Sequence, residues 1–363
     1  MSLYDHKFLN DMKGIHNKYS TIFIFGILQL CAVFVSSCSK FDTKDSETDI
    51  AISFNSSIGK MNSTNTRSIV SSGSDIESFG VFTQIDYGSG FSSWIENELV
   101  VKDGKYYSFA NDKYWLRNCK YHFSAIYPFM SEITVEAVTS SNGQSGYLYI
   151  IPYTTTSQTL TDPIDFMVAH AEEISTTESI SDSAPEAVPL AFKHKLSKVT
   201  LNIYKSIENN SDQIKITGLS LSGINTKGVC YSSAIENSAI NKWEVGSETQ
   251  TLSSSNLNAE VGVSSPYSID MLYIPQNIYT GSGVSKSGKV NLEISYTFQN
   301  NGNGTAESYT IEKTIPIDNI DAWLEGEHIT YKLTITVEND IIFSTPTVNT
   351  WGIQQSGGTI IIK

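Results

Sequence analysis

Short runs of apolar residues recur along most of the chain, separated by turns rich in Ser, Asn and Gly. Many runs alternate apolar and polar positions with a period of two and are rich in β-branched residues, which is typical of strands with one buried face. They occupy residues 50–54, 79–85, 121–128, 146–153, 198–204, 214–223, 270–276, 290–298 and 329–337. Long helix-period patterns are hard to find after residue 37. The pattern therefore predicts an all-β protein built from antiparallel β-sandwiches.

The longest uninterrupted apolar stretch lies near the start of the chain, from about Ile22 to Val35. It is shorter than the roughly 20 residues that a helix needs to cross a bilayer. Lys13 and Lys18 precede it and small residues follow it, which is the layout of a secretory signal. Residues 1–37 are thus predicted to be a signal peptide, with Met1 or Met12 as its start.

The end of this stretch resembles a bacterial lipobox, in which an aliphatic residue and two small residues precede a cysteine that becomes acylated. Here the four residues are Val35, Ser36, Ser37 and Cys38. We expect Cys38 to carry lipid and to anchor the protein in the outer membrane at the cell surface. The alternative is an ordinary cleaved signal followed by a chance cysteine. With lipid on Cys38, the polar residues 38–49 would form a flexible tether that holds the domains off the membrane.

The length after the signal predicts two domains rather than one core. Residues 172–187 have little apolar content and a net negative charge, so they are expected to be a long loop or linker near the domain boundary. The predicted domains are residues 50–186 and 187–363.

The charge of the chain excludes one class of partner. The formal net charge is −14, and it becomes −15 without residues 1–37, which hold three lysines and two aspartates. Because the basic residues are scattered, we expect no nucleic-acid binding. Cys119 and Cys230 lie far apart in the sequence, and buried free thiols are favoured over a single disulfide.

No pattern of catalytic or metal-binding residues stands out in the sequence. The histidines that remain after the signal lie on separate segments without paired ligand spacing, and no nucleophile elbow or phosphate-binding loop is present. These histidines are His122, His170, His194 and His328. The sequence predicts no enzyme, no metal site and no cofactor. The 19 tyrosines could offer stacking surfaces for sugars, although most alternate within strands and are expected in cores.

Several stretches together resemble the fimbrillin-like family of exported lipoproteins of Bacteroidetes, the type V pilins. They are "FGVFTQ" (79–84), Trp115 followed by "AIYP" (125–128), "DFMVA" (165–169), "PLAFKHKLSKVTLNI" (189–203), "YIPQ" (273–276), and "GEHITYKLTITV" (326–337) with Trp351. The resemblance covers residues 48–363. It implies two transthyretin-like β-sandwich domains in tandem, with "AFKHKLSKV" opening the second.

The resemblance also implies a function, that of a pilus subunit contributing to adhesion. In this family a protease cuts after an arginine, the first strand is removed, and a strand of another subunit fills the groove. The matching positions are Ile50, Ile52 and Phe54 for the displaced strand and the bond between Arg67 and Ser68 for the cut. Arg67 is one of only two arginines in the chain and lies in a Ser/Thr/Asn-rich run that is expected to be exposed.

The expected partners are other pilin subunits, in a homopolymer or a heteropolymer. Residues Ile360, Ile361 and Ile362 are either the donor strand or the last strand of the second domain, so shaft, anchor and tip roles stay open. The competing hypothesis is a monomeric surface-anchored lipoprotein that binds glycan or a host protein through its loops.

Overall fold

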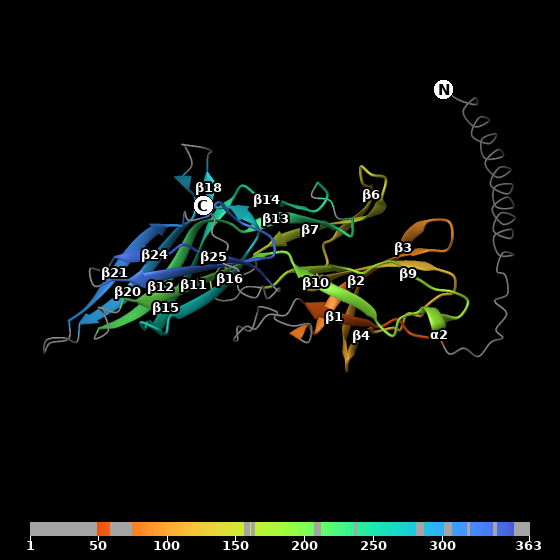
Figure 1. The fold of residues 1–363 in the computed structure, drawn as a ribbon, viewed down its shortest axis with the longest axis horizontal. Coiled ribbons are helices and arrows are strands. Elements are labelled where there is room, and N and C mark those ends of the chain that lie inside the picture. The colour runs from red at the N-terminus through yellow and green to blue at the C-terminus, as the bar shows by residue number, and fades with distance from the viewer. Residues whose placement is uncertain are drawn as a thin grey trace, which may run out of the picture. The chain divides into compact units, whose positions relative to one another are not determined.

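The structure is a computed structural model that describes residues 49–58, 75–155, 160, 164–206, 212–235, 237, 239–280, 287–300, 307–317, 320–336 and 340–351. Strands dominate this part of the chain, which confirms the all-β prediction, and the described helix α2 (Ile180–Ser183) has four residues. In Figure 1 the strands from β1 to β10 are drawn in red to yellow-green, and those from β11 onward are drawn in green to blue.

The first sheet contains eight strands and closes on itself. Its order is β2-β3-β4-β1-β10-β8-β5-β9, and β5 also pairs with β2 along seven residue pairs. The closed sheet surrounds a core of apolar and aromatic side chains. The strands are β1 (Phe54–Ile58), β2 (Ser78–Asp86), β3 (Phe91–Asp103), β4 (Tyr106–Phe109), β5 (Lys120–Tyr127), β8 (Met167–His170), β9 (Ile174–Ser175) and β10 (Val188–His194).

A second group of strands forms a sandwich of two sheets. One sheet has the order β16-β11-β23-β24, with β25 also on β23, and the other has the order β15-β12-β20-β21. Alternate residues of both sheets point into one core, as a period of two requires. The strands are β11 (Ser197–Lys205), β12 (Gln213–Asn225), β15 (Thr249–Glu260), β16 (Tyr267–Tyr273), β20 (Asn291–Asn300), β21 (Glu307–Pro316), β23 (Glu327–Ile335), β24 (Ile341–Phe343) and β25 (Thr347–Thr350).

A four-stranded sheet, here called the bridging sheet, joins the two halves of the sequence. Its order is β14-β13-β7-β6, so two strands come from each half. Its inner face forms a small core with the outer face of the first sheet. The strands are β6 (Thr134–Thr139), β7 (Ser145–Thr154), β13 (Lys227–Ser233) and β14 (Lys242–Val245), and two short pairs complete the fold: β17 (Gln276–Asn277) with β22 (Ala322–Trp323) and β18 (Tyr279–Thr280) with β19 (Ser287–Gly288).

The chain leaves the first sheet later than the sequence predicts. β10 pairs in parallel with β1 and in an antiparallel arrangement with β8, so Val188–His194 belongs to the first sheet. The next strand, β11, pairs with β16 and β23 of the sandwich. The first sheet therefore includes β10, which lies beyond the boundary expected between residues 186 and 187, and the division into two domains there stays a prediction.

The segment expected to be a long loop or linker, residues 172–187, packs against the first core. Ile174 of β9 pairs with Tyr121, and Ile180 of α2 is buried. The Thr176 hydroxyl donates a hydrogen bond to the Leu116 carbonyl (2.6 Å) and accepts one from the Cys119 amide (3.0 Å). The segment is therefore an ordered loop with two short regular elements, because a few apolar and hydrogen-bonding side chains fix it although its average composition is polar.

Candidate functional site

The segment proposed to be displaced contains one of the strands of the closed first sheet, β1. The strand itself begins at Phe54 rather than Ile50 and runs to Ile58. Ahead of it, the Ile52 amide donates to the Lys113 carbonyl (2.7 Å) and the Trp115 amide donates to the Ile50 carbonyl (3.1 Å). Residues 50–58 are thus held by two successive partners, first the chain near Trp115 and then β4 and β10.

The strand β1 is the link between β4 and β10. It pairs in parallel with β10 over five residue pairs, from Phe54 with Val188 to Ile58 with Phe192, and it pairs with β4 through Phe54 and Tyr107. In the order of the sheet β4 and β10 meet only through β1. Removal of β1 would therefore open the ring and expose the backbone N–H and C=O groups of β10 that now pair with it.

The side chains of this segment fill the first core. Ile52 is 2% exposed and Phe54 is fully buried, whereas Ile50 is half-buried. The Phe54 ring makes edge contacts with Phe109 and Phe123, at centroid distances of 5.4 and 5.7 Å. The residues that the sequence singled out thus lie together, with Ile58 as a third buried side chain that sequence reasoning missed although it continues the same alternation.

The other predicted site residues fall outside the described part of the chain. These are Cys38, Arg67, Ser68, Ile360, Ile361 and Ile362. In the described part, no helix has the length and hydropathy of a membrane-crossing segment. No three His, Cys, Asp or Glu side chains of the same part form a group that could hold a metal ion.

The two cysteines of the described part are free and buried, in two different cores. This confirms the free-thiol interpretation over the disulfide. Burial disfavours the thiolate and raises the pKa of Cys230 to about 12. Neither residue has the low thiol pKa of a reactive cysteine, since burial also raises the pKa of Cys119.

A cleft of about 1140 Å³ opens between the outer face of the first sheet and the bridging sheet. At its closed side, Phe82, Ile126 and Val168 of the first sheet belong to the same apolar cluster as Tyr149 and Ile151 of β7. Two residues further along their strands, the outward positions become polar. The apolar contact between the two sheets is therefore followed by a polar surface in the cleft, here called the polar floor, which contains Gln84, Ser124 and His170.

The polar floor is a hydrogen-bonded network that joins the two sheets through His170. Its Nδ1 lies 2.8 Å from Ser124 Oγ on β5, and its Nε2 lies 3.1 Å from Ser232 Oγ on β13. Burial, followed by the positive charges of Lys195 and Lys193, lowers the pKa of His170 to about 3. The imidazole is thus neutral at physiological pH. Beside it, Gln84 Nε2 donates to the Tyr149 hydroxyl (3.1 Å).

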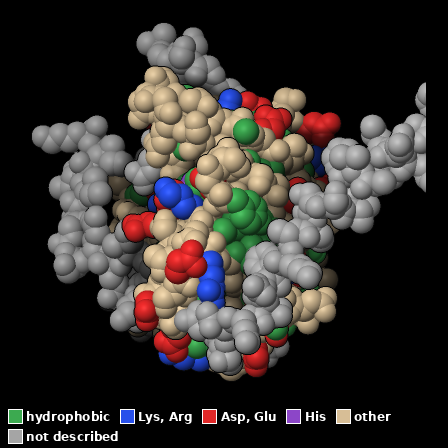
Figure 2. Space-filling model, turned by 90° about the vertical axis from the view of Figure 1, so that its right-hand side faces the viewer, with side chains coloured by type: hydrophobic (Ala, Val, Ile, Leu, Met, Phe, Trp, Pro, Cys, Tyr) green, Lys and Arg blue, Asp and Glu red, His purple; other side chains and the backbone are tan. Residues whose placement is uncertain are grey.

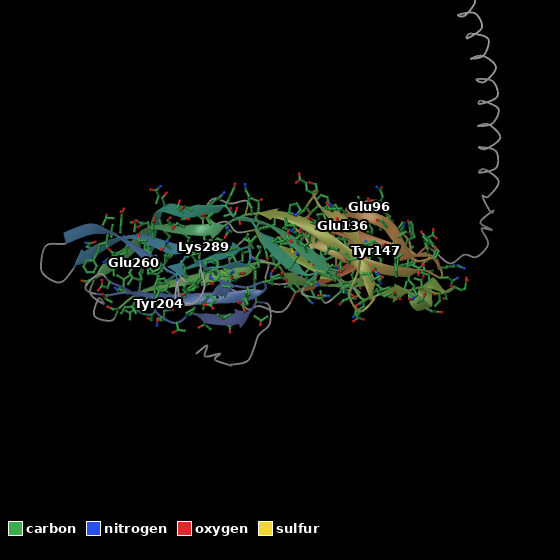
Figure 3. The ribbon with its side chains drawn as sticks, turned by 90° about the horizontal axis from the view of Figure 1, so that it is seen from above. Glu96, Glu136, Tyr147, Tyr204, Glu260 and Lys289 are labelled. Atoms are coloured by element: carbon green, nitrogen blue, oxygen red, sulfur yellow. The ribbon has the colours of Figure 1, made fainter. Side chains whose placement is uncertain are left out.

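The mouth of the cleft carries aromatic rings and charged groups. The rings of Phe91 and His122 stack with centroids 3.9 Å apart, and the Tyr147 hydroxyl donates to the Phe91 carbonyl (3.1 Å). Glu173 lies 3.0 Å from Lys120 and 3.4 Å from His122. Figure 3 labels Tyr147, which lies on β7 of the bridging sheet. Sequence reasoning missed this site because its residues come from distant segments that share no motif.

Charged side chains on one face of the molecule are mixed in sign. Figure 2 shows lysine and arginine side chains scattered among aspartate and glutamate on the face that it presents, without a broad basic area. A nucleic-acid surface needs such an area, because the phosphate backbone dominates affinity.

The closed β-sheet, the sandwich and the bridging sheet together define an all-β protein. Comparison with protein families identifies the family. Residues 66–351 match the model of the fimbrillin-like family. The chain therefore belongs to the fimbrillin-like family, as the sequence motifs predicted.

A solved structure of a fimbrial protein shows the same fold. The chain is similar to a fimbrial protein from Bacteroides vulgatus, with 17% sequence identity over 82% of this chain and 99% of that chain and a TM-score of 0.53. It also aligns with the tip fimbrial protein Mfa3 from Porphyromonas gingivalis, with 10% identity over 84% of this chain and 100% of that chain and a TM-score of 0.35. A search of curated proteins found no match.

Proposed function

We propose that this protein is a structural subunit of a type V cell-surface fimbria, exported as a lipoprotein through Cys38 and contributing to adhesion. Membership of the fimbrillin-like family supports a pilin-like role. A fimbrial protein shares the fold. The single observation that carries the assembly mechanism is the place of β1 as the link between β4 and β10 in a closed sheet.

Assembly would begin with a cut between Arg67 and Ser68. The cut separates residues 50–58 covalently from the rest of the first sheet, since β2 begins after it. The segment is then held only by noncovalent contacts. A second subunit would donate a strand to the vacated edge of β10, and residues 360–362 of this chain are the proposed donor.

The free energy of burying apolar side chains favours a first sheet that has a strand in the place of β1 over a sheet that lacks one. Ile52, Phe54 and Ile58 are buried, and each contributes roughly 1.5–3 kcal/mol by leaving water. Their loss removes about 5–9 kcal/mol, which is comparable to the roughly 5–15 kcal/mol that separates folded from unfolded domains. A subunit without β1 is therefore strongly driven to accept another strand of similar alternation.

The test is assembly after cleavage by an arginine-specific protease. The purified protein should lose its N-terminal segment and form ladders or filaments that resist mild denaturant. Arg67→Lys keeps the positive charge but removes the cleavage site, so this variant should stay monomeric. Arg117→Ala is the matched control and should still be cut and assemble.

A peptide of residues 50–58, added in excess during cleavage, should refill the groove and block assembly, whereas the same peptide with Phe54→Asp should not. A cut protein that stays a soluble monomer, alone and with partner subunits, would contradict the pilin mechanism. The monomeric surface binder would then be the better account.

A further inference from the structure

We propose that the cleft between the first sheet and the bridging sheet binds a neutral oligosaccharide. The inference deepens the adhesive part of the proposed function and rests on it. It concerns a different part of the first sheet from the core that β1 fills, namely the outer face, where Gln84, Ser124 and His170 project.

The size of the cleft favours an extended ligand. A volume of about 1140 Å³ exceeds the roughly 300–1,000 Å³ of ordinary small-molecule pockets. The cleft is also bounded by two sheets whose hydrogen bonding holds their strands in place, so it is formed before any ligand arrives. A chain of several sugar rings fits such a preformed groove at a lower entropic cost than a ligand that must order the protein.

The chemistry of the lining favours hydroxyl-rich ligands. The lining includes amide, hydroxyl and carboxylate groups, among them those of Gln144, Ser145 and Glu172. Such groups donate and accept hydrogen bonds in the pairs that sugar hydroxyls require. Aromatic rings at the mouth, Tyr147 and the stacked pair of Phe91 and His122, offer flat apolar faces on which the C–H face of a sugar ring can pack.

The charges of the lining favour a neutral ligand. Glu173 is paired with Lys120, and Lys195 is paired with Glu325 at 2.7 Å. Among the described residues that line the cleft, the exposed Glu172 and Lys193 have no ion-pair partner, and they are of opposite sign. The unpaired charge therefore sums to zero, and a polyanion such as a nucleic acid or an acidic glycan finds no net attraction.

The experiment is calorimetric titration of the purified, intact and uncleaved protein with cellohexaose, maltohexaose and chitohexaose, and with hexagalacturonate as the anionic comparison. At least one of the three neutral hexasaccharides should bind saturably. Tyr147→Ala should weaken that binding at least tenfold, and the double variant Glu172→Ala/Lys193→Ala at least threefold. The double variant keeps the proposal testable if Tyr147→Ala folds poorly, because both of its side chains are exposed.

Tyr204→Ala is the matched control. Tyr204 is a half-buried tyrosine of β11 with Lys332 over its ring, and Figure 3 shows it in the other half of the ribbon. The affinity of Tyr204→Ala for the bound hexasaccharide should stay within twofold of the wild-type affinity. The proposal is wrong if no neutral hexasaccharide binds, if hexagalacturonate binds more tightly than all three, or if the cleft variants bind like the wild type. Binding is measured before cleavage and assembly after it, so failure here is distinct from failure of strand exchange.

Discussion

The indole of Trp351 lies flat on the imidazole of His194, with ring centroids 3.6 Å apart and planes 7° from parallel. His194 ends the last strand of the first sheet, and its Nδ1 lies 3.1 Å from the buried carboxylate of Asp165. Trp351 follows β25 of the sandwich, and its amide donates to the Gly326 carbonyl (2.6 Å). The stack therefore ties the end of the sandwich to the end of the first sheet.

We expect Trp351→Ala to lower the free energy of unfolding by about 3–5 kcal/mol, the usual cost of truncating a buried large aromatic side chain. Trp351→Phe keeps a ring over His194 and should cost less than half as much. Urea unfolding followed by circular dichroism measures both. Equal losses for the two variants would show that a smaller ring over His194 does not stabilise this contact.

Stability should fall as the pH falls below neutrality, and His170 should account for part of the fall. The pKa of His170 is lowered from an ordinary 6.5 to about 3, chiefly by burial. Between these values the unfolded chain takes up a proton that the folded protein does not, so acid favours unfolding by up to about 1.4 kcal/mol per pH unit. Above pH 6.5 this contribution is constant.

The measurement is the free energy of unfolding from pH 8 to pH 4 for the wild type and for His170→Gln, which retains hydrogen-bonding groups without titrating. The wild type should lose about 3 kcal/mol more than the variant between pH 7 and pH 4. The variant should keep some slope, because burial also lowers the pKa of His328 to about 4. Identical slopes would contradict a buried, neutral His170.

Lipid attachment at Cys38 predicts that Cys38→Ala leaves an exported protein that no longer fractionates with membranes. Labelling of cells with a clickable palmitate analogue should mark the wild type and not this variant. Cys31→Ala is the matched control within the predicted signal peptide, since Cys31 lacks the small preceding residues of a lipobox, and this variant should be labelled normally. Unchanged labelling of Cys38→Ala would contradict the lipobox interpretation.

The strands that the sequence predicted are those with a buried face. The runs at 79–85 and 198–204 became β2 and β11 with bounds shifted by one residue at each end, because alternation records the contrast between core and surface. β3 and β15 were missed although they are long, since few of their side chains are buried and their sequences are polar. Backbone pairing with a neighbouring strand fixes them, and a single sequence carries no record of that pairing.

The candidate site was predictable only in its local part. The alternation of Ile50, Ile52 and Phe54 indicated a strand with one apolar face, and the structure buries Ile52 and Phe54. The position of this strand between β4 and β10 was not predictable, because it depends on contacts between segments more than a hundred residues apart, such as Phe54 with Val188. The cleft is equally nonlocal, because Ser124, His170 and Ser232 meet only through the packing of two sheets.

The contribution of β1 to the first core can be measured before any cleavage. Phe54 is fully buried against Phe109 and Phe123, so Phe54→Ala should lower the free energy of unfolding by about 3–5 kcal/mol. Asn55→Ala is the matched control on the same strand, since Asn55 is exposed, and it should change stability by less than about 0.5 kcal/mol. After cleavage at Arg67, the Phe54→Ala segment should also leave the sheet faster, so assembly should begin earlier. A stability loss below about 1 kcal/mol would mean that β1 contributes little to this core, and the driving force proposed for strand exchange would be missing.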